Sequence, residues 1–174
     1  MPHLRQELDE CLHGRVCFLG LGNVDYGDDA FGVRVAEGLF NAGVPNALVA
    51  GNNPDRYIGF VTDRDFDNVI FVDAVEFGGE PGSLLLLRSQ EISERFPQFS
   101  THKISIGLLA QCVESNGKTK AWLLGVQPER VNRKEGLSAT VQFSCDALVE
   151  LLKGLLPATK FLVRERTASE YVVQ

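Results

Sequence analysis

The stretch VCFLGLGNVDYGDDAFGVRVA, residues 16–36, decides the fold of this chain. It opens with an apolar run that does not alternate with polar residues, which predicts a strand covered on both faces. Gly20 and Gly22 allow the backbone to turn sharply where that strand ends. Asp28 and Asp29 then open an amphipathic helix, at the end where capping side chains and negative charge are favourable. The stretch is therefore typical of the strand, turn and helix that begin an α/β domain.

The two adjacent aspartates of this stretch need more than one explanation. A helix cap accounts for one of them, Asp28 or Asp29, and leaves the other without a structural role. Ligands of open α/β sheets bind just beyond the carboxyl ends of the strands, where this loop lies. A spare carboxylate there is a candidate site residue, and the alternative is that both aspartates only cap the helix.

The remainder of the chain continues the alternation of strands and helices. Four more strands are predicted, over residues 46–50, 69–75, 83–88 and 121–126. The third of these follows the second too closely for a helical crossover, so we expect an antiparallel edge strand. Residues 89–101 contain a proline and mixed polar side chains, and we expect them to be largely irregular. The predicted fold class is α/β, a three-layer sandwich with a mixed, mostly parallel, twisted sheet of about five strands and helices on both faces.

Two predicted helices carry apolar stripes that should face the core. The first stripe consists of Val35, Ala36, Leu39 and Phe40. The second stripe, in the helix that follows His102, consists of Ile104, Leu108, Leu109 and Cys112. Both have the spacing of amphipathic helices that pack with one side on a sheet.

Length and composition indicate a single domain over residues 1–174, with an N-terminal arm over 1–15 and a C-terminal tail over 157–174. The net charge of −6 argues against a broad nucleic-acid surface. No apolar run reaches membrane-spanning length and the N-terminus lacks the core of a signal peptide, so we expect a cytoplasmic protein without a membrane partner. We also expect a monomer. The four cysteines are scattered, without a C-x-x-C pair, and indicate neither a zinc ribbon nor a redox pair.

Three polar residues stand at predicted strand or helix ends: Asp29, Asp73 and His102. Asp73 ends the most apolar strand, where burying a charge without partners would be costly. His102 precedes a predicted helix, whose N-terminus disfavours a protonated imidazole and suits a neutral metal ligand. Loops after neighbouring parallel strands share one rim of the sheet, and two carboxylates with one imidazole suit a borderline divalent transition metal. The alternative is two helix or loop caps and a surface histidine.

Other chemistries fit these loops less well. The G-L-G turn at residues 20–22 begins like a dinucleotide fingerprint, but Asp25 stands where the third glycine belongs. The chain has no Walker lysine motif and no G-x-S-x-G elbow. Asp28 and Asp29 would also repel a pyrophosphate.

The segments GLGN (residues 20–23) and GDDAFGVR (27–34) together resemble the opening signature of the hydrogenase maturation proteases, the endopeptidases that process nickel-iron hydrogenase large subunits. The resemblance continues at residues 72–74, at His102 before a helix, and at residues 125–128 and 136–138. It covers residues 16–155 and implies an α/β sandwich around a mixed five-stranded twisted sheet.

By this resemblance, Asp29, Asp73 and His102 are both the metal ligands and the catalytic residues. The metal is nickel carried by the substrate, although another divalent transition metal could occupy the site. The implied reaction is one cut near the C-terminus of a nickel-loaded nickel-iron hydrogenase large-subunit precursor, which removes a short extension. The metal could polarise the carbonyl or activate the attacking water, or a carboxylate could act as base.

Two other functions stay open from the sequence. The first is a non-catalytic metal-binding assembly module that escorts the large subunit. The second is a metal-dependent peptidase of related fold that acts on another protein. Only the maturation protease predicts a shortened large subunit.

Overall fold

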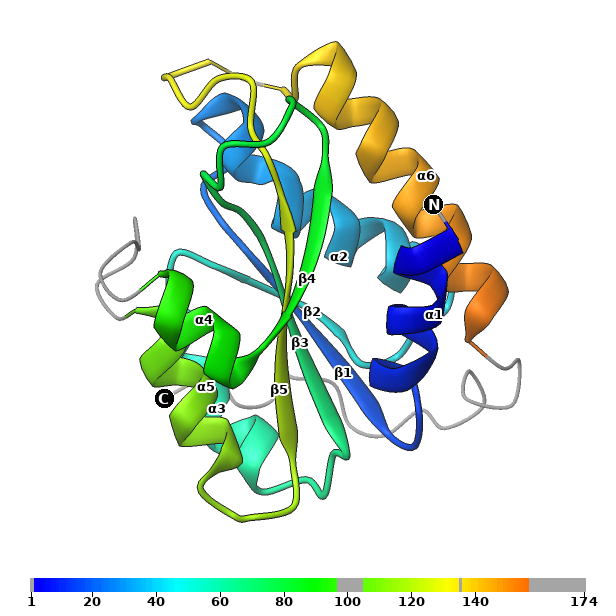
Figure 1. The fold of residues 1–174 in the computed structure, drawn as a ribbon, viewed down its shortest axis with the longest axis vertical. Coiled ribbons are helices and arrows are strands. Elements are labelled where there is room, and N and C mark those ends of the chain that lie inside the picture. Colours follow the sequence, from blue (N-terminus) through cyan, green and yellow to red (C-terminus); the bar gives the residue numbers. More distant parts are fainter. Residues whose placement is uncertain (1, 97–104, 135, 157–174) are drawn as a thin grey trace.

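Five strands form one mixed sheet in the computed structural model of the protein, which describes residues 2–96, 105–134 and 136–156 (Figure 1). The strands are β1 (Val16–Leu21), β2 (Ala47–Gly51), β3 (Asn68–Ala74), β4 (Leu84–Arg88) and β5 (Lys120–Val126). They lie in the order β2-β1-β3-β5-β4, and every neighbouring pair is parallel except β4 with β5. The predicted mixed, mostly parallel sheet is confirmed, and its antiparallel strand lies at an edge as expected.

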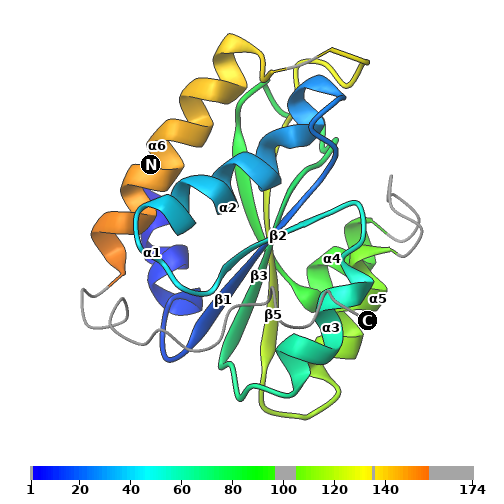
Figure 2. The ribbon, with the colours of Figure 1, turned by 180° about the vertical axis from the view of Figure 1, so that it is seen from behind.

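Helices cover both faces of this sheet, so the predicted three-layer arrangement is also confirmed (Figures 1 and 2). On one face lie α1 (Pro2–Cys11), α2 (Phe31–Asn41) and α6 (Ala139–Leu155). On the other lie α3 (Asp55–Thr62), α4 (Ser89–Arg95) and α5 (Ile106–Glu114). A short 3-10 helix, η1 (Gly27–Ala30), leads into α2. None of the helices in the described ranges is both long and apolar enough to cross a membrane.

Consecutive side chains of the central strands enter two separate cores, which explains the unbroken apolar runs. Phe18 of β1 and Ile70 of β3 are buried in a cluster with side chains of α1, α2 and α6. Their neighbours Leu19 and Phe71 are buried in the cluster on the opposite face, with side chains of α3, α4 and α5. Because successive strand residues point to opposite faces, a strand covered on both sides is apolar at every position.

Two glycines let the start of α2 rest directly on the backbone of the sheet. A Cβ atom at Gly32 would lie 1.9 Å from the carbonyl oxygen of Val72, and one at Gly20 would lie 2.2 Å from the carbonyl oxygen of Gly32. Any larger side chain at either position would force the helix away from β1 and β3. This close approach also places η1, which directly precedes α2, against β3.

The N-terminal arm predicted over residues 1–15 contains the helix α1, and Leu8 and Cys11 of this helix and Leu12 directly after it are buried in the core. The C-terminal tail, residues 157–174, lies outside the described residues. Of the stripe predicted for α2, Val35, Ala36 and Leu39 are buried, whereas Phe40 is exposed. Phe40 follows Leu39 by about 100° around the helix, which carries it past the contact with the sheet.

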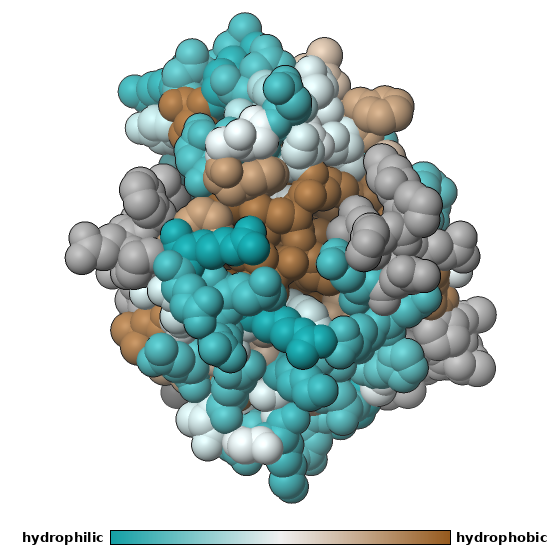
Figure 3. Space-filling model, viewed as in Figure 1, coloured by the Kyte–Doolittle hydropathy of each residue, from teal (hydrophilic) through white to brown (hydrophobic). Residues whose placement is uncertain are grey.

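The edge strand β4 has no strand on its outer side within the part of the chain that the structure describes. Leu84, Leu85 and Leu86 are half-buried, and Figure 3 shows apolar surface in the region of this edge. The strand ends at Arg88, whose guanidinium carbon lies 5.2 Å from the ring centre of Trp122. A charged terminal residue is a common way to limit pairing along an exposed edge.

The expectation that residues 89–101 are largely irregular is wrong for the described part of that segment, most of which is α4. The backbone N–H of Arg88 donates to Oε2 of Glu91 at 3.0 Å, so the side chain of Glu91 caps the first turn. Ile92 is fully buried and anchors the helix. Pro97 follows the helix and therefore does not interrupt it; it and residues 98–101 lie outside the described residues.

The apolar stripe predicted for the helix after His102 is on the wrong side of that helix. Leu108 and Cys112 are exposed, and Ile104 lies outside the described residues. The helix begins later than predicted, because Ser105 is its N-cap and accepts a hydrogen bond from the N–H of Leu108 at 3.3 Å. The residues that α5 buries are Ile106, Gly107, Leu109, Ala110 and Val113.

Candidate active site

Asp29 is held at the carboxyl end of β1 by a tight contact between two backbone segments. Gly22 follows the strand with φ +114°, and a Cβ atom there would lie 1.7 Å from the carbonyl oxygen of Asp29. Only glycine permits this conformation and this approach. The N–H of Asn23 donates to Oδ2 of Asp29 at 2.8 Å, and the residue is only 6% exposed. The turn therefore positions the Asp29 carboxylate as well as the backbone.

Asp73 lies at the carboxyl end of β3, the strand that pairs with both β1 and β5. It is 3% exposed, and its Oδ1 accepts a hydrogen bond from the N–H of Ala74 at 2.9 Å. Because η1 lies against β3, the structure brings Asp29 and Asp73 to the same end of the sheet. Two of the three predicted site residues therefore share one rim, as the strand order requires.

His102, the third predicted site residue, lies outside the described residues. The helix expected to follow it begins at Ile106, with Ser105 as its N-cap. Within the described ranges, no group of three or more His, Cys, Asp or Glu side chains could hold a metal ion. The three-residue metal site therefore stays a prediction.

Asp28 has a different role from the helix cap that the sequence suggested. It is fully buried, and its carboxylate accepts hydrogen bonds from the loop that follows β5. Oδ2 accepts from the N–H groups of Glu129 and Arg130, each at 2.9 Å, and from Oγ–H of Ser138 at 2.9 Å. Oδ1 accepts from the N–H of Ser138 at 2.6 Å. The capping interpretation is therefore wrong for Asp28, because α2 begins only at Phe31 and this side chain points to another loop.

Backbone hydrogen bonds join the same two loops a second time. The N–H of Gly27 donates to the carbonyl of Lys134 at 2.6 Å, and the N–H of Lys134 donates to the carbonyl of Asp25 at 3.0 Å. The N–H of Asp28 donates to the carbonyl of Arg130 at 3.1 Å. The loop after β5 is thus fixed along its length to the segment that precedes Asp29.

Gln127 is a buried residue for which sequence reasoning assigned no role. Its Oε1 accepts from the N–H groups of Phe77 at 2.9 Å and Gly79 at 3.2 Å, and its Nε2 donates to Oε2 of Glu76 at 2.7 Å. These bonds tie down the loop that follows Asp73. Two features of the sequence could have indicated this role. The amide side chain of Gln127 directly follows the last apolar strand, and the glycine-rich loop 76–82 has backbone N–H groups that need acceptors.

The cysteines supply no activated thiol at this rim. Cys11, Cys17 and Cys145 are buried, and Cys112 is exposed on α5. Burial raises the pKa of Cys11 and Cys145 to about 12, and it raises the pKa of Cys17 further. These three thiols therefore stay protonated at neutral pH, where the thiolate is the reactive form.

One thiol, that of Cys112, is expected to react rapidly with a thiol reagent such as dithionitrobenzoate in the native protein. All four cysteines should react once the protein is unfolded in guanidinium. The measurement is the released chromophore per protein under both conditions, and native Cys112→Ser protein should give almost none. Rapid reaction of the native Cys112→Ser protein would show that one of the buried thiols is accessible.

Comparison with known proteins places this arrangement in a family. The family model described as hydrogenase maturation protease matches residues 33–154. The hydrogenase 2 maturation protease of Escherichia coli is 28% identical over 144 residues, which cover 78% of this chain and 87% of that protein. The crystal structure of a [NiFe] hydrogenase maturation protease, HycI, from Thermococcus kodakarensis superimposes with a TM-score of 0.76 at 30% identity, covering 86% of this chain and 98% of that chain.

The structure of the hydrogenase maturating endopeptidase HybD from E. coli gives a TM-score of 0.67 at 28% identity and covers 80% of this chain and 90% of that chain. The matched residues 33–154 include all but the first two residues of α2, the strands β2 to β5 and Asp73. The chain therefore belongs to the hydrogenase maturation protease family, and it is a hydrolase of the endopeptidase type.

Proposed function

We propose that this chain removes the C-terminal extension of a nickel-loaded nickel-iron hydrogenase large-subunit precursor. The observation that carries the proposal is the pair of buried carboxylates, Asp29 and Asp73, each oriented by a backbone N–H at the same end of the sheet. Buried carboxylates at strand ends are costly unless partners or a bound cation compensate their charge. Both carboxylates have partners within the chain, and carboxylate oxygens held in this way are suitable ligands for a divalent cation that arrives with the substrate.

In this proposal the substrate's nickel is the recognition element, and Asp29, Asp73 and His102 bind it. Carboxylate and imidazole are suitable ligands for a divalent transition metal, and another such metal could take the same position. Binding the metal sets which peptide bond lies beside the carboxylates. Water then attacks that bond, assisted by polarisation of its carbonyl by the metal or by transfer of the water's proton to a carboxylate.

The surrounding loops support this role by their rigidity. Gln127 holds the loop after Asp73, and Asp28 holds the loop after β5 against the segment that carries Asp29. A site built on fixed loops orients a bound peptide at little cost in conformational entropy. We place this activity in the cytoplasm and expect the chain to act as a monomer.

Cells that lack this protein are expected to accumulate a large subunit that is heavier by its C-terminal extension. Purified protein added to that precursor should trim it only when the precursor carries nickel, because the metal provides the binding site. Intact mass spectrometry measures both results, with nickel-free precursor as the control. Trimming of nickel-free precursor at the same rate would overturn the metal requirement, and binding without any trimming would favour the escort function.

A further inference from the structure

The two edges of the sheet differ in how they are protected. At the edge formed by β2, the carbonyl of Val49 accepts a hydrogen bond from the hydroxyl of Tyr57 at 2.9 Å. At the other edge, β4 ends at Arg88, whose N–H donates to Oε2 of Glu91. Between its start at Leu84 and this end, β4 has no such protection within the described residues, although proteins usually block exposed edges against pairing with another chain.

The hydrogen-bond pattern shows which backbone groups of β4 bond to β5. Two antiparallel strands exchange hydrogen bonds at every second residue. The N–H of Gln127 donates to the carbonyl of Ser83 at 2.8 Å, directly before β4 begins. Two and four residues after Ser83, the residues of β4 that bond to β5 are therefore Leu85 and Leu87.

The N–H and C=O groups of Leu84 and Leu86 consequently point to the open side of β4. Val126, which lies opposite Leu84, agrees with this alternation, because its carbonyl accepts from the N–H of Val75 at 2.9 Å on the side of β3. Neither Leu84 nor Leu86 has a further hydrogen bond in the described part of the chain. These backbone groups are the ones that a short extended peptide uses when it pairs with a sheet as an added strand.

Apolar side chains lie on both sides of this open edge. Leu84 and Leu86 are half-buried against the core that contains α1, and Leu85 is half-buried against the core that contains α4. Figure 3 shows the resulting apolar surface. A strand added to β4 would extend both cores and cover these side chains, so apolar burial would add to the backbone hydrogen bonds.

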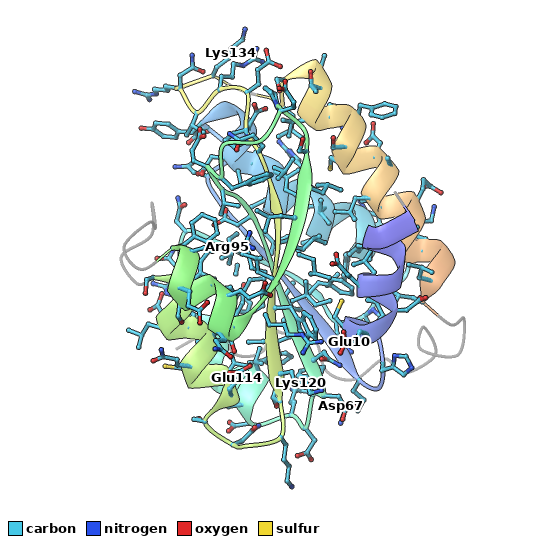
Figure 4. All side chains as sticks on the ribbon, viewed as in Figure 1. Glu10, Asp67, Arg95, Glu114, Lys120 and Lys134 are labelled. Carbon is cyan, nitrogen blue, oxygen red and sulfur yellow. The ribbon has the colours of Figure 1, made fainter. Side chains whose placement is uncertain are left out.

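One exposed guanidinium accompanies the open edge. Figure 4 shows Arg95, at the end of α4, where the same view in Figure 3 has a hydrophilic side chain at the margin of the apolar surface. No ion pair involves Arg95 in the described ranges. Both glutamates of α4 have partners, since Glu91 accepts from the N–H of Arg88 and Glu94 accepts from Nε2 of Gln90 at 3.1 Å. The edge therefore suits an extended segment that carries apolar side chains and a carboxylate.

The open edge begins at the rim that carries Asp73. Asp73 lies opposite Gly125 of β5, and Gly125 lies opposite Leu85 of β4. Neighbouring strands are about 4.8 Å apart, so a strand added to β4 would lie about 14 Å from β3 at the level of Asp73. An extended chain covers about 3.3 Å per residue, so about four or five residues join these two positions. One peptide can therefore occupy the carboxylate site and the open edge together.

Chain direction indicates which part of the precursor lies along the edge. β4 runs away from this rim, since Leu84 lies opposite Val126, the last residue of β5. A chain that leaves the rim along the edge is therefore parallel to β4 and follows the cut peptide bond. A segment before the cut would have to run antiparallel to β4 and be free of the subunit to which it belongs. The extension, a free chain end, meets neither restriction.

We propose that the open edge of β4 binds the C-terminal extension of the precursor as an added parallel strand, paired with Leu84 and Leu86. This inference rests on the proposed function, because it takes the precursor as the substrate. The first paired residue of the extension lies about four or five residues after the cut. The edge holds the extension in place and takes no part in breaking the peptide bond.

A proline scan of the extension, made in nickel-loaded precursor, tests the pairing without changing the enzyme. Proline lacks the N–H that a paired residue donates, and only every second residue of a strand donates to a given neighbour. Proline at alternate positions beyond about the fourth residue should raise KM about 5- to 10-fold, and proline at the positions between them should change KM less than about 2-fold. Alanine at each position separates loss of the N–H from loss of the side chain. If KM shows no such two-residue period, the inference is wrong.

Leu86→Pro makes the corresponding change in the enzyme, because proline is tolerated on an edge strand where the N–H points outward. It should raise the KM for unmodified precursor about 5- to 10-fold. Val49→Pro is the matched control, since the bond from Tyr57 shows that the backbone of Val49 also faces outward, at the opposite edge of the sheet. Its KM should equal that of the wild type. Circular dichroism verifies that both variants are folded, and equal KM values for two folded variants would contradict the proposal.

Hydrogen exchange in the free protein, followed by NMR, shows whether anything else covers the edge. The amides of Leu84 and Leu86 should exchange much faster than those of Leu85 and Leu87, at rates that do not depend on protein concentration. Slow exchange that depends on concentration would mean that a second copy pairs there. Slow exchange at every concentration would mean that residues 157–174 of the same chain cover the edge. Either result would overturn the inference, whereas failure of the wild type to trim the precursor would overturn the proposed function.

Discussion

Asp73→Asn is expected to reduce the rate of precursor processing by about 1,000-fold while the protein still folds. Asparagine has the same shape, and its Oδ1 can accept the hydrogen bond that the N–H of Ala74 now donates at 2.9 Å. The substitution removes the negative charge, which is the property needed to hold a cation or to accept the proton of the attacking water. The measurement is the trimming rate of nickel-loaded precursor by intact mass, together with thermal unfolding followed by circular dichroism.

Asp65→Asn makes the same chemical change at a site that should not matter. Asp65 is exposed in the turn before β3, at the amino end of that strand, away from the rim that carries Asp73. Its variant should trim the precursor at the wild-type rate. If Asp73→Asn processed the precursor as fast as Asp65→Asn, Asp73 would have no part in the mechanism.

Asp28→Ala is expected to lower the free energy of unfolding by about 3 kcal/mol, because it leaves buried donors without their charged acceptor. The N–H groups of Glu129, Arg130 and Ser138 and the hydroxyl of Ser138 all lose a partner. Urea denaturation measures the change as a lower midpoint with an unchanged slope. Processing should also slow under conditions where the variant is folded, because the loop after β5 is no longer fixed beside Asp29.

Two further variants show whether the buried carboxylate is responsible. Ser138→Ala removes only the hydroxyl donor and is expected to cost about 1 kcal/mol. Asp25→Ala removes a nearby exposed carboxylate and should cost less than about 0.5 kcal/mol. An Asp28→Ala protein that is no less stable than Ser138→Ala would show that the carboxylate does not hold the loop.

The strands could be predicted because their unbroken apolar runs follow from their position between two layers of helices. Phe18 and Leu19 enter opposite cores, so a strand with helices on both sides needs apolar residues at every position. The order of strands and the loop lengths then place Asp29 and Asp73 near the carboxyl ends of parallel strands, where sites form. Both conclusions rest on local pattern and on chain connectivity.

The helix phases could not be predicted as well, because helix ends depend on caps and on contacts that the pattern does not show. Leu108 and Cys112 were assigned to the core although both are exposed, because the neighbouring pair Leu109 and Val113, which is buried, has the same i, i+4 spacing. The helix α4 was missed because its seven residues contain a single fully buried side chain, that of Ile92, which is too weak a periodic signal.

The sequence by itself determined the α/β class, the mixed sheet with its antiparallel edge strand, and the two carboxylates at strand ends, because all of these follow from periodicity and connectivity. Only the tertiary structure decided which loops the buried side chains of Asp28 and Gln127 hold by hydrogen bonds. Asp28 accepts hydrogen bonds from residues 101 to 110 positions later in the chain, and Gln127 holds a loop 48 to 51 positions earlier. These groups come within hydrogen-bond distance only when β1, β3 and β5 have aligned their carboxyl ends. Local sequence patterns therefore cannot predict these hydrogen bonds.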